Sequence, residues 1–284
     1  MVLSSVFGMF LALASANLIG ASDFCGGLAS RRGGGLRVVV VSSLAGTILL
    51  FVFSLIWDET RLPVGDVVWS LLAGISGSLA VITIYRGLVI GNAAAVAPIA
   101  GVIGAALPAA FGMLTLGLPP ASQLAGFLLA FPGIALVSRS QTESGQVKKE
   151  ALLMAVLSGI FAAGFFTCLS QVAPGTVVLP SLVAKLGSFG TALLLALLQP
   201  KTAATLPFRQ ISPLAILGGA LDSIASALYV MAQQYTRLDV AVVLTSLYPA
   251  ATIILAYFIQ KEHISRWQWV GVVLCLAAIV LIVL

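Results

Sequence analysis

Long apolar segments separated by short polar connectors run along the whole chain. A helix needs about 20 apolar residues to cross a hydrocarbon core of about 30 Å, and charges together with Gly and Pro divide this chain into ten such segments. The stretch between Arg86 and Arg139 carries no charge and is far too long for one crossing, so we expect it to turn back at residues 117–120, "GLPP". The pattern therefore predicts an all-α polytopic membrane protein with ten transmembrane helices.

The connectors set the boundaries of these helices. The first three helices are expected at residues 3–28, 38–57 and 67–88, and the fourth and fifth on either side of residues 117–120. The last five helices are expected at residues 151–172, 177–198, 214–235, 240–259 and 267–284. The first segment lacks the basic leader of a signal peptide, so we expect it to be a retained helix.

Composition supports a lipid-embedded chain and excludes several function classes. Hydrophobic residues make up 60% and charged residues 8%, whereas soluble domains carry about 25% charged residues. The net charge of +5 is scattered singly rather than gathered in a basic stripe, which argues against nucleic-acid binding. Three separated cysteines and the lone His263 favour neither a disulfide framework nor a metal site. No phosphate-binding loop occurs, and "GISGS" at residues 74–78 departs from the nucleophile motif, so we expect neither an enzyme nor a cofactor.

Short motifs recur in the two halves of the chain at a nearly constant spacing. "GTILL" at residues 46–50 matches "GTALL" at 190–194, and "QLAG" at 123–126 matches "QWVG" at 268–271. We therefore expect one five-helix repeat in residues 1–139, a polar linker in 140–150 and a second repeat in 151–284. Five crossings in each repeat force the second copy to be inverted in the membrane, around a central cavity, as in many secondary transporters.

Basic residues are concentrated in the connectors that follow the odd-numbered helices. Those connectors hold Arg31, Arg32, Arg37, Arg86, Arg139, Lys148, Lys149, Lys201, Arg209, Lys261 and Arg266. The connectors after the even-numbered helices hold only Arg61 and Arg237. The positive-inside rule places the odd connectors in the cytoplasm, so we expect a multi-pass inner-membrane protein with both termini outside.

The last three expected helices resemble the end of an EamA-type repeat in the drug/metabolite transporter superfamily. The features that carry the resemblance are Tyr229, Ala232, the Leu247-Tyr248-Pro249 segment, Glu262 and the Gln268-x-x-Gly271 opening of the last helix. The first half shows the same layout but has Gly117 where the second half has Glu262, so we expect Glu262 to cap a helix or bridge a connector rather than bind substrate. The resemblance implies ten helices, a central cavity and transport of small polar metabolites, most commonly amino acid export.

Lys185 lies inside an otherwise apolar helix, with Ser181 and Ser188 on the same face. A charge at the centre of a membrane is costly and usually faces a partner or a wet cavity. Two interpretations remain open. Lys185 lines the cavity and meets a substrate carboxylate or Asp222, or its long side chain snorkels to the membrane surface.

Asp222 begins a polar stripe along one face of the next helix, which continues through Ser226, Tyr229 and Gln233. Such a stripe lines a wet cavity or forms a polar seam between packed helices. Burial suits a carboxyl group that gains and loses a proton during transport. A neighbouring Lys185 would instead make Asp222 one half of a structural ion pair.

Asp23 is the third charged residue expected within the membrane. It lies in "NLIGASDFCGG", where Asn17, Gly20 and Ser22 predict an irregular helix. Either the first helix is kinked or broken here and offers backbone groups to a ligand, or Ser22 or Asp23 caps a short helix near the interface.

Prolines interrupt two expected helices. Pro98 and Pro108 lie in the fourth helix and Pro249 lies in the ninth, and each removes one backbone hydrogen bond. Such kinks serve packing, or they serve as hinges along a gated pathway.

These features together predict a secondary active transporter that exports small polar metabolites such as amino acids by alternating access. The alternatives are a multidrug or amphiphile efflux carrier and a solute channel. Lys185 is the expected partner of a substrate carboxylate, Asp222 the partner of a proton or an ammonium group, and Tyr229 and Gln233 orienting donors. We expect a small-molecule substrate, possible proton coupling and function as a monomer.

Overall fold

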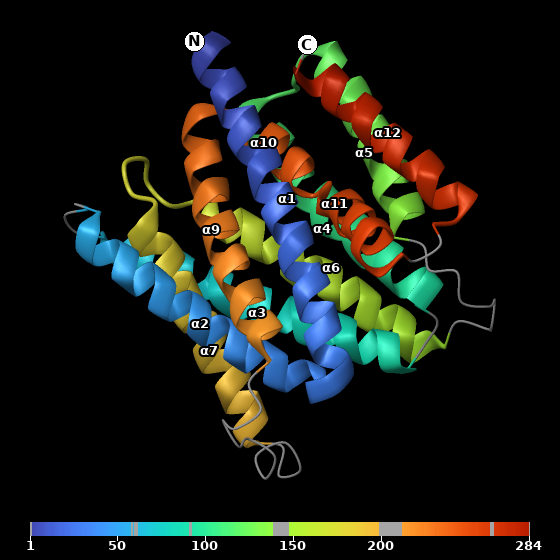
Figure 1. Ribbon diagram of the computed structural model, residues 1–284. Coiled ribbons are helices and arrows are strands. Elements are labelled where there is room, and N and C mark those ends of the chain that lie inside the picture. The colour runs from blue at the N-terminus through green and yellow to red at the C-terminus, as the bar shows by residue number, and fades with distance from the viewer. Residues whose placement is uncertain are drawn as a thin grey trace.

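The computed structural model describes residues 2–57, 59, 62–90, 93–138, 148–198, 212–261 and 264–283 (Figure 1). The helices in the first half of the chain are α1 (Val2–Gly33), α2 (Gly35–Ile56), α3 (Val64–Ile90), α4 (Ala93–Leu116) and α5 (Ala121–Val137). Those in the second half are α6 (Lys149–Leu169), α7 (Val178–Leu197), α9 (Pro213–Tyr235), α10 (Leu238–Thr245), α11 (Tyr248–Leu255), the π-helical turn η2 (Ala256–Gln260) and α12 (Arg266–Val283).

The predicted all-α polytopic fold is confirmed. Within the described residues, nine helical segments are long and apolar enough to cross a membrane, with α10, α11 and η2 counted as one, and α5 is apolar but shorter. The turn expected at residues 117–120 separates α4 from α5. Gly117 has a φ of 78°, which glycine adopts without the clash that a Cβ would cause.

The irregularity expected around Asp23 is wrong, because α1 is helical without a break from Val2 to Gly33. Its small residues serve packing instead. A Cβ on Gly20 would lie 2.7 Å from the carbonyl oxygen of Tyr248, so glycine lets α1 and α11 approach closely. The hydroxyl of Ser22 donates to the carbonyl of Gly218 on α9 rather than capping its own helix.

The three prolines that were predicted as hinges differ in whether their helix is interrupted. Helix α4 continues through Pro98 and Pro108, so neither residue ends it. The helix expected at residues 240–259 is divided instead, since α10 ends at Thr245 and Pro249 lies in the first turn of α11. Proline is well tolerated there because the first N–H groups of a helix have no internal partner.

Helices from the two halves pack against each other in pairs. The main pairs are α1 with α9, α3 with α6 and α5 with α12, the last seen side by side at the upper right of Figure 1. Helix α2 lies against α7 and α9, and α7 also contacts α3. In chain order, α1, α2, α3 and α5 of the first half correspond to α6, α7, α9 and α12 of the second. The pair α1–α9 therefore corresponds to the pair α6–α3. The pairs α5–α12 and α2–α7 each correspond to themselves.

Individual hydrogen bonds follow the same exchange. The buried hydroxyl of Ser15 on α1 donates to the carbonyl of Ala225 on α9 at 2.8 Å. The buried hydroxyl of Ser158 on α6 donates to the carbonyl of Ala80 on α3 at 2.9 Å. The two acceptor residues, Ala80 and Ala225, are 145 positions apart in the sequence. Ser43 and Ser188, whose hydroxyls lie near each other, are also 145 positions apart. The two bonds therefore occupy matching places in the two halves.

The contact between α5 and α12 also repeats itself. A Cβ on Gly126 would meet the carbonyl of Ala278 at 3.0 Å, and a Cβ on Gly271 would meet the carbonyl of Gly133 at 2.9 Å. Adding 145 to 126 and 133 gives 271 and 278. These matched contacts are consistent with the predicted inverted repeat, while the boundaries at residues 139 and 151 stay a prediction.

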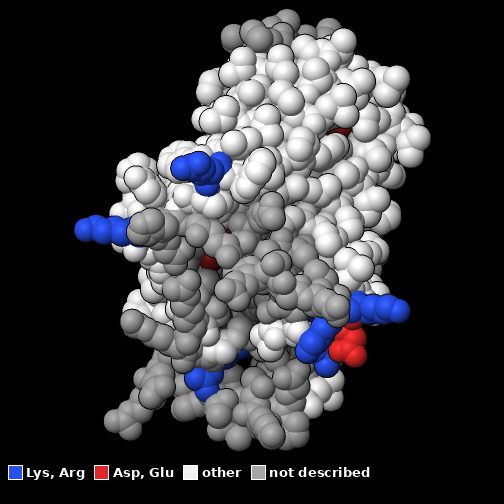
Figure 2. All heavy atoms as spheres, turned by 90° about the vertical axis from the view of Figure 1, so that its right-hand side faces the viewer, with Lys and Arg blue, Asp and Glu red and all other residues white. Residues whose placement is uncertain are grey.

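The outer surface of the bundle is strongly apolar. Phe10, Leu128 and Leu276 are 65%, 66% and 56% exposed, as expected for side chains that face lipid tails. Figure 2 shows a face whose upper part is almost free of charged side chains, while the basic side chains that it draws lie lower down. This surface fits a multi-pass membrane protein.

The structure describes some of the basic connector residues on which the predicted membrane orientation rests. Both termini lie at one end of the bundle (Figure 1), and the order of the helices places Arg37, Arg86, Lys148, Lys261 and Arg266 at the other end. The side chains of Arg31 and Arg32, together with Arg61, Arg139, Lys201, Arg209 and Glu262, lie outside the described residues. The orientation with outside termini stays a prediction.

The connector before α3 supports the start of α7. Both carboxylate oxygens of Glu59 accept backbone hydrogen bonds, from Val177 at 2.7 Å and from Val178 and Leu179 at 2.8 Å each. The first N–H groups of a helix have no partner within the helix, and a carboxylate is favoured there by the helix dipole. Glu59 therefore positions the helix that carries Lys185.

We predict that Glu59→Ala lowers the stability of the protein by about 0.5–2 kcal/mol, the usual cost of losing a helix cap. Chemical unfolding of the purified protein in detergent measures the change. Glu150→Ala is the control, because no hydrogen bond or ion pair joins its side chain to the described residues. Equal losses in the two variants would contradict the capping role.

Candidate functional site

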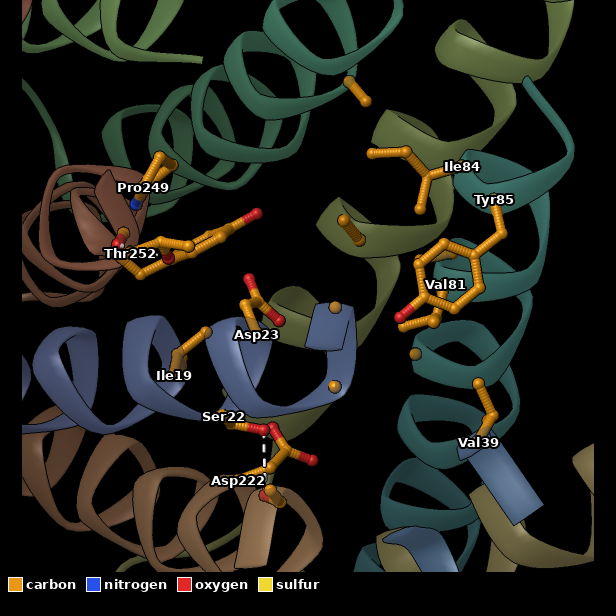
Figure 3. Close-up of a pocket in the computed structure, with 18 of the residues that line it drawn as sticks. Ile19, Ser22, Asp23, Val39, Val81, Ile84, Tyr85, Asp222, Pro249 and Thr252 are labelled. Atoms are coloured by element: carbon orange, nitrogen blue, oxygen red, sulfur yellow. Dashed lines mark hydrogen bonds between the residues drawn. The ribbon is translucent and has the colours of Figure 1, made fainter. Parts of the chain in front are cut away.

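A cavity of about 840 Å³ lies among the helices of both halves. Its lining comes from residues 19–27 of α1, 38–43 of α2, 74–85 of α3 and 215–222 of α9, and from α4, α5, α6, α7, α11 and α12. Figure 3 shows the part of the cavity bordered by α1, α3, α9 and α11. The cavity thus occupies the half of the bundle away from the termini.

The half of the bundle nearer the termini is filled by the main hydrophobic core. Met9, Phe127, Leu169, Tyr229 and Leu244 belong to this core, and each is at most 7% exposed. Packing there is close because glycines lie at the helix crossings. A Cβ on Gly8, for example, would lie 2.9 Å from the backbone nitrogen of Thr236. Among the described residues, the cavity thus lies in one half of the bundle and most of this core in the other.

Lys185 and Asp222 form an ion pair on the cavity wall, between the Nζ atom and Oδ2. The side chain of Lys185 is 9% exposed and that of Asp222 is 42% exposed. Lys185 therefore points into the bundle rather than snorkelling to its edge. The pair joins α7 to α9, and its more exposed partner, Asp222, presents a carboxylate to the cavity.

The two serines predicted beside Lys185 lie in different surroundings. Ser188 lines the cavity, and its hydroxyl is 3.4 Å from that of Ser43, which lines the cavity from α2. Ser181 does not line the cavity, and its hydroxyl donates to the carbonyl of Val177 in the turn before it. Of the two, Ser188 alone remains a candidate for ligand contact.

The rest of the stripe below Asp222 forms a seam between helices. The fully buried hydroxyl of Tyr229 donates to the carbonyl of Phe166 on α6 at 3.2 Å. Ser226 and Gln233 donate to carbonyls of their own helix, those of Asp222 and Tyr229. These three residues share a face with Asp222 but continue into the closed half, so they do not line the cavity. Their predicted role in substrate binding stays a prediction.

Asp23 lines the cavity from α1 and is exposed to it. Among the described residues, its carboxylate has no hydrogen-bond or ion-pair partner. Figure 3 shows Asp23 and Asp222 on the same side of the cavity, with the ring of Tyr85 across from them. Asn17, which was predicted to contribute, lies outside the lining and donates to the carbonyl of Leu13 at 2.8 Å.

Tyr85, Tyr248 and Thr252 also line the cavity, although the sequence did not single them out as ligand contacts. Tyr85 precedes Arg86 near the end of a helix, a position typical of interfacial anchors. Its ring lies against α2, where a Cβ on Gly35 would be 2.6 Å from the ring. Tyr248 precedes Pro249 at the break between α10 and α11. The sequence signals were the Leu247-Tyr248-Pro249 segment for Tyr248 and the position beside Arg86 for Tyr85.

Of the three predicted hinge residues, Pro249 lines the cavity, while Pro98 and Pro108 do not. Within the part of the chain that the structure describes, no group of three or more His, Cys, Asp or Glu could hold a metal ion. The arrangement is suited to binding by charge and hydrogen bonds.

Comparison with known proteins adds two findings. The model of the EamA-like transporter family matches residues 149–284, from the start of α6 to the end of the chain. One crystal structure of a protein resembles this chain with a TM-score of 0.70 at 16% identity, over 98% of this chain and 96% of that one. At this identity the likeness concerns the fold alone. No curated protein matches the chain in sequence.

Proposed function

Through residues 149–284 this chain belongs to the EamA-like transporter family, and from this premise we propose a secondary transporter of small polar metabolites that works by alternating access. Amino acids are the first candidates. The observation that carries the proposal is the cavity, which is lined by helices of both halves and contains ionisable side chains at mid-helix positions. Such residues within membrane spans usually mark a solute or proton pathway.

The uneven packing of the bundle supports alternating access. The cavity lies in one half of the bundle, while most of the main core lies in the other and reaches the cavity wall at Val137, Phe166 and Ala184. A carrier built from two related halves moves a solute by opening one end as the other closes. The matched contacts of α1–α9 and α6–α3 fit such an exchange, because each pair could take over the position of the other.

The ion pair offers groups that a zwitterion can use. When Lys185 and Asp222 separate, the ammonium of Lys185 can receive a substrate carboxylate, and Asp222 can receive a proton or an ammonium group. A buried charge left without a partner is costly. A zwitterion compensates both charges when it enters, so the pair can open without leaving either charge unpaired.

The location of the cavity fits the loading state of an exporter. It lies at the end of the bundle that carries the odd-numbered, basic connectors, which the positive-inside rule places in the cytoplasm. In this conformation a cytoplasmic solute can load, and closure of this end would release it on the other side. We therefore propose an inner-membrane exporter with outside termini.

Substrate counterflow in proteoliposomes tests the function. We expect counterflow of an amino acid by the wild type and a loss of at least about tenfold in Lys185→Ala and Asp222→Asn, since each leaves a charge unpaired. Ser181→Ala is the matched control on α7, because its hydroxyl bonds only within its own helix. Uncoupled flux without counterflow would indicate a channel. Normal counterflow in both charge variants would remove these residues from the site.

A further inference from the structure

One face of α1 presents Asp23 between two glycines. Gly20 and Gly26 lie three residues before and three residues after Asp23, so the three residues lie close to one another along the helix. Each glycine lies beside a tyrosine from another helix. This geometry places Asp23 close to Tyr85 and to the start of α11, where Tyr248 also lines the cavity.

The first of these tyrosines is Tyr85 on α3. A Cβ on Gly26 would lie 3.9 Å from the hydroxyl of Tyr85, so that hydroxyl lies over the turn of α1 next to Asp23. The ring of Tyr85 packs closely against Gly35 of α2, which helps to hold the ring in place. In Figure 3 the ring of Tyr85 faces Asp23 across the cavity.

The second tyrosine is Tyr248, the first residue of α11. Its carbonyl oxygen would be 2.7 Å from a Cβ on Gly20, and the residue lines the cavity. Thr252, one turn later, donates to the carbonyls of Gly20 and Tyr248 at 3.2 Å each. These bonds hold the start of α11 against α1, so Tyr248 stays beside Asp23.

The charges that the described residues bring to the cavity do not balance. Among these residues, the lining contains three that are charged at neutral pH in water, namely Asp23, Lys185 and Asp222. Lys185 pairs with Asp222, so its charge is already compensated. Among the described residues the carboxylate of Asp23 has no partner. A carboxylate beside aromatic rings in a low-dielectric site attracts a cation, and a cation over such a ring gains further attraction.

We propose that Asp23, Tyr85 and Tyr248 form the binding site for the charged nitrogen of the solute. The preferred solutes are small organic ammonium ions with an apolar body. Ile19, Val81 and Ile84 line the neighbouring wall and provide the apolar surface for that body. The inference rests on the proposed transport function and narrows its substrate class, from polar metabolites in general to amines.

The ion pair explains why an amine is preferred over an amino acid with the same side chain. An amino acid can give its carboxylate to Lys185 and its ammonium group to Asp222 only by opening the ion pair, and Asp23 is then still without a cation. An amine brings only the charge that Asp23 lacks. The amine therefore binds without opening the ion pair.

Three probes with one branched apolar body test the inference: 3-methylbutylamine, leucine and 4-methylpentanoate. Calorimetry with the purified full-length protein in detergent measures their affinities. We expect the amine to bind at least about tenfold more tightly than leucine and the acid not to bind, since each unmatched buried charge opposes binding. Tighter binding of leucine than of the amine would overturn the inference, as would no binding of the amine to the wild type.

Variants assign the site to its residues. Asp23→Asn should weaken binding of the amine at least about tenfold, because a charge-assisted contact is lost. Asp66→Asn is the matched control, since its carboxylate accepts a hydrogen bond from Ala173 and does not line the cavity. Tyr85→Phe should keep the affinity within a few-fold and Tyr85→Leu should lower it, because the ring rather than the hydroxyl attracts the cation.

The variants also separate this inference from the transport function. If Asp23→Asn and Tyr85→Leu both bind the amine as the wild type does, the ammonium site is wrong even when counterflow occurs. If Asp23→Asn does not fold, the Tyr85 pair decides alone. If the amine binds through these residues but no solute shows counterflow, the transport function fails and the ammonium site stands.

Discussion

Replacing Gly74 by Val should prevent α3 from packing against α7 and sharply reduce the amount of folded protein. At this crossing a Cβ on Gly74 would overlap the carbonyl oxygen of Ala184 and lie 2.9 Å from the backbone nitrogen of Ser188. Backbone atoms cannot move aside as a flexible side chain can. Overpacking typically costs about 1–3 kcal/mol, and a direct backbone clash costs more. Size-exclusion chromatography in detergent and chemical unfolding measure the loss.

Helix α7, the partner of α3 at this crossing, provides the control for this prediction. Gly190 lies on α7 with nothing within 4 Å of a Cβ placed on it. Gly190→Ala should leave the fold intact and stabilise it slightly, because alanine is favoured over glycine in a helix by about 1 kcal/mol. If Gly74→Val elutes and unfolds as the wild type does, the crossing is not as close as described. Because Ala184 precedes Lys185, the crossing also positions the ion pair.

Removing Arg237 should be the most destabilising loss of a single charge. Asp239 is completely buried, and its carboxylate pairs with Arg237 at 2.8 and 3.1 Å. Arg237 also donates to the carbonyls of Leu116 and Gly117, at the turn between α4 and α5. The hydrogen bond with Asp239 raises the pKa of Arg237 above its ordinary value, so the guanidinium stays charged. Arg237→Ala should lower the unfolding free energy by about 3–5 kcal/mol, as for other broken buried pairs.

A double variant tests the reason for this loss. Arg237→Ala together with Asp239→Asn should recover part of the stability, because no uncompensated charge is then left buried. The recovery is measured by chemical unfolding of both variants in the same detergent. If the double variant is no more stable than Arg237→Ala, the cost comes from the lost contacts with the turn at Gly117 rather than from the charge of Asp239.

The helices could be predicted from the sequence because their length and hydrophobicity are local properties. The expected boundaries at 177–198 and 214–235 differ by only one residue at any end from α7 and α9. Other ends differ more, and α1 continues five residues beyond its expected end at residue 28. The expected helix at 240–259 is divided, and the break between α10 and α11 falls before Pro249. The glycines around Asp23 were misinterpreted because glycine in a sequence indicates either a bend or a close contact, and only the neighbouring helix decides between the two.

The candidate site could be predicted only in part. Lys185, Asp222 and Asp23 were found because a charge within an apolar segment needs a polar environment, and the structure brings all three to the cavity. Tyr229 and Gln233 were placed on the cavity because they share the face of Asp222. Helical periodicity reports the face of a residue but not whether the bundle is hollow or packed at its depth.

The sequence by itself determined that the chain crosses a membrane many times, where most helices begin and end, and which charges must be sheltered from lipid. These properties depend on the length and polarity of each segment alone. Only the tertiary structure decided that Lys185 meets Asp222, that Asp23, Tyr85 and Tyr248 line one cavity, and that this cavity lies in the half of the bundle away from the termini. Those facts depend on how closely helices distant in sequence approach one another, and the glycines at their crossings set that approach.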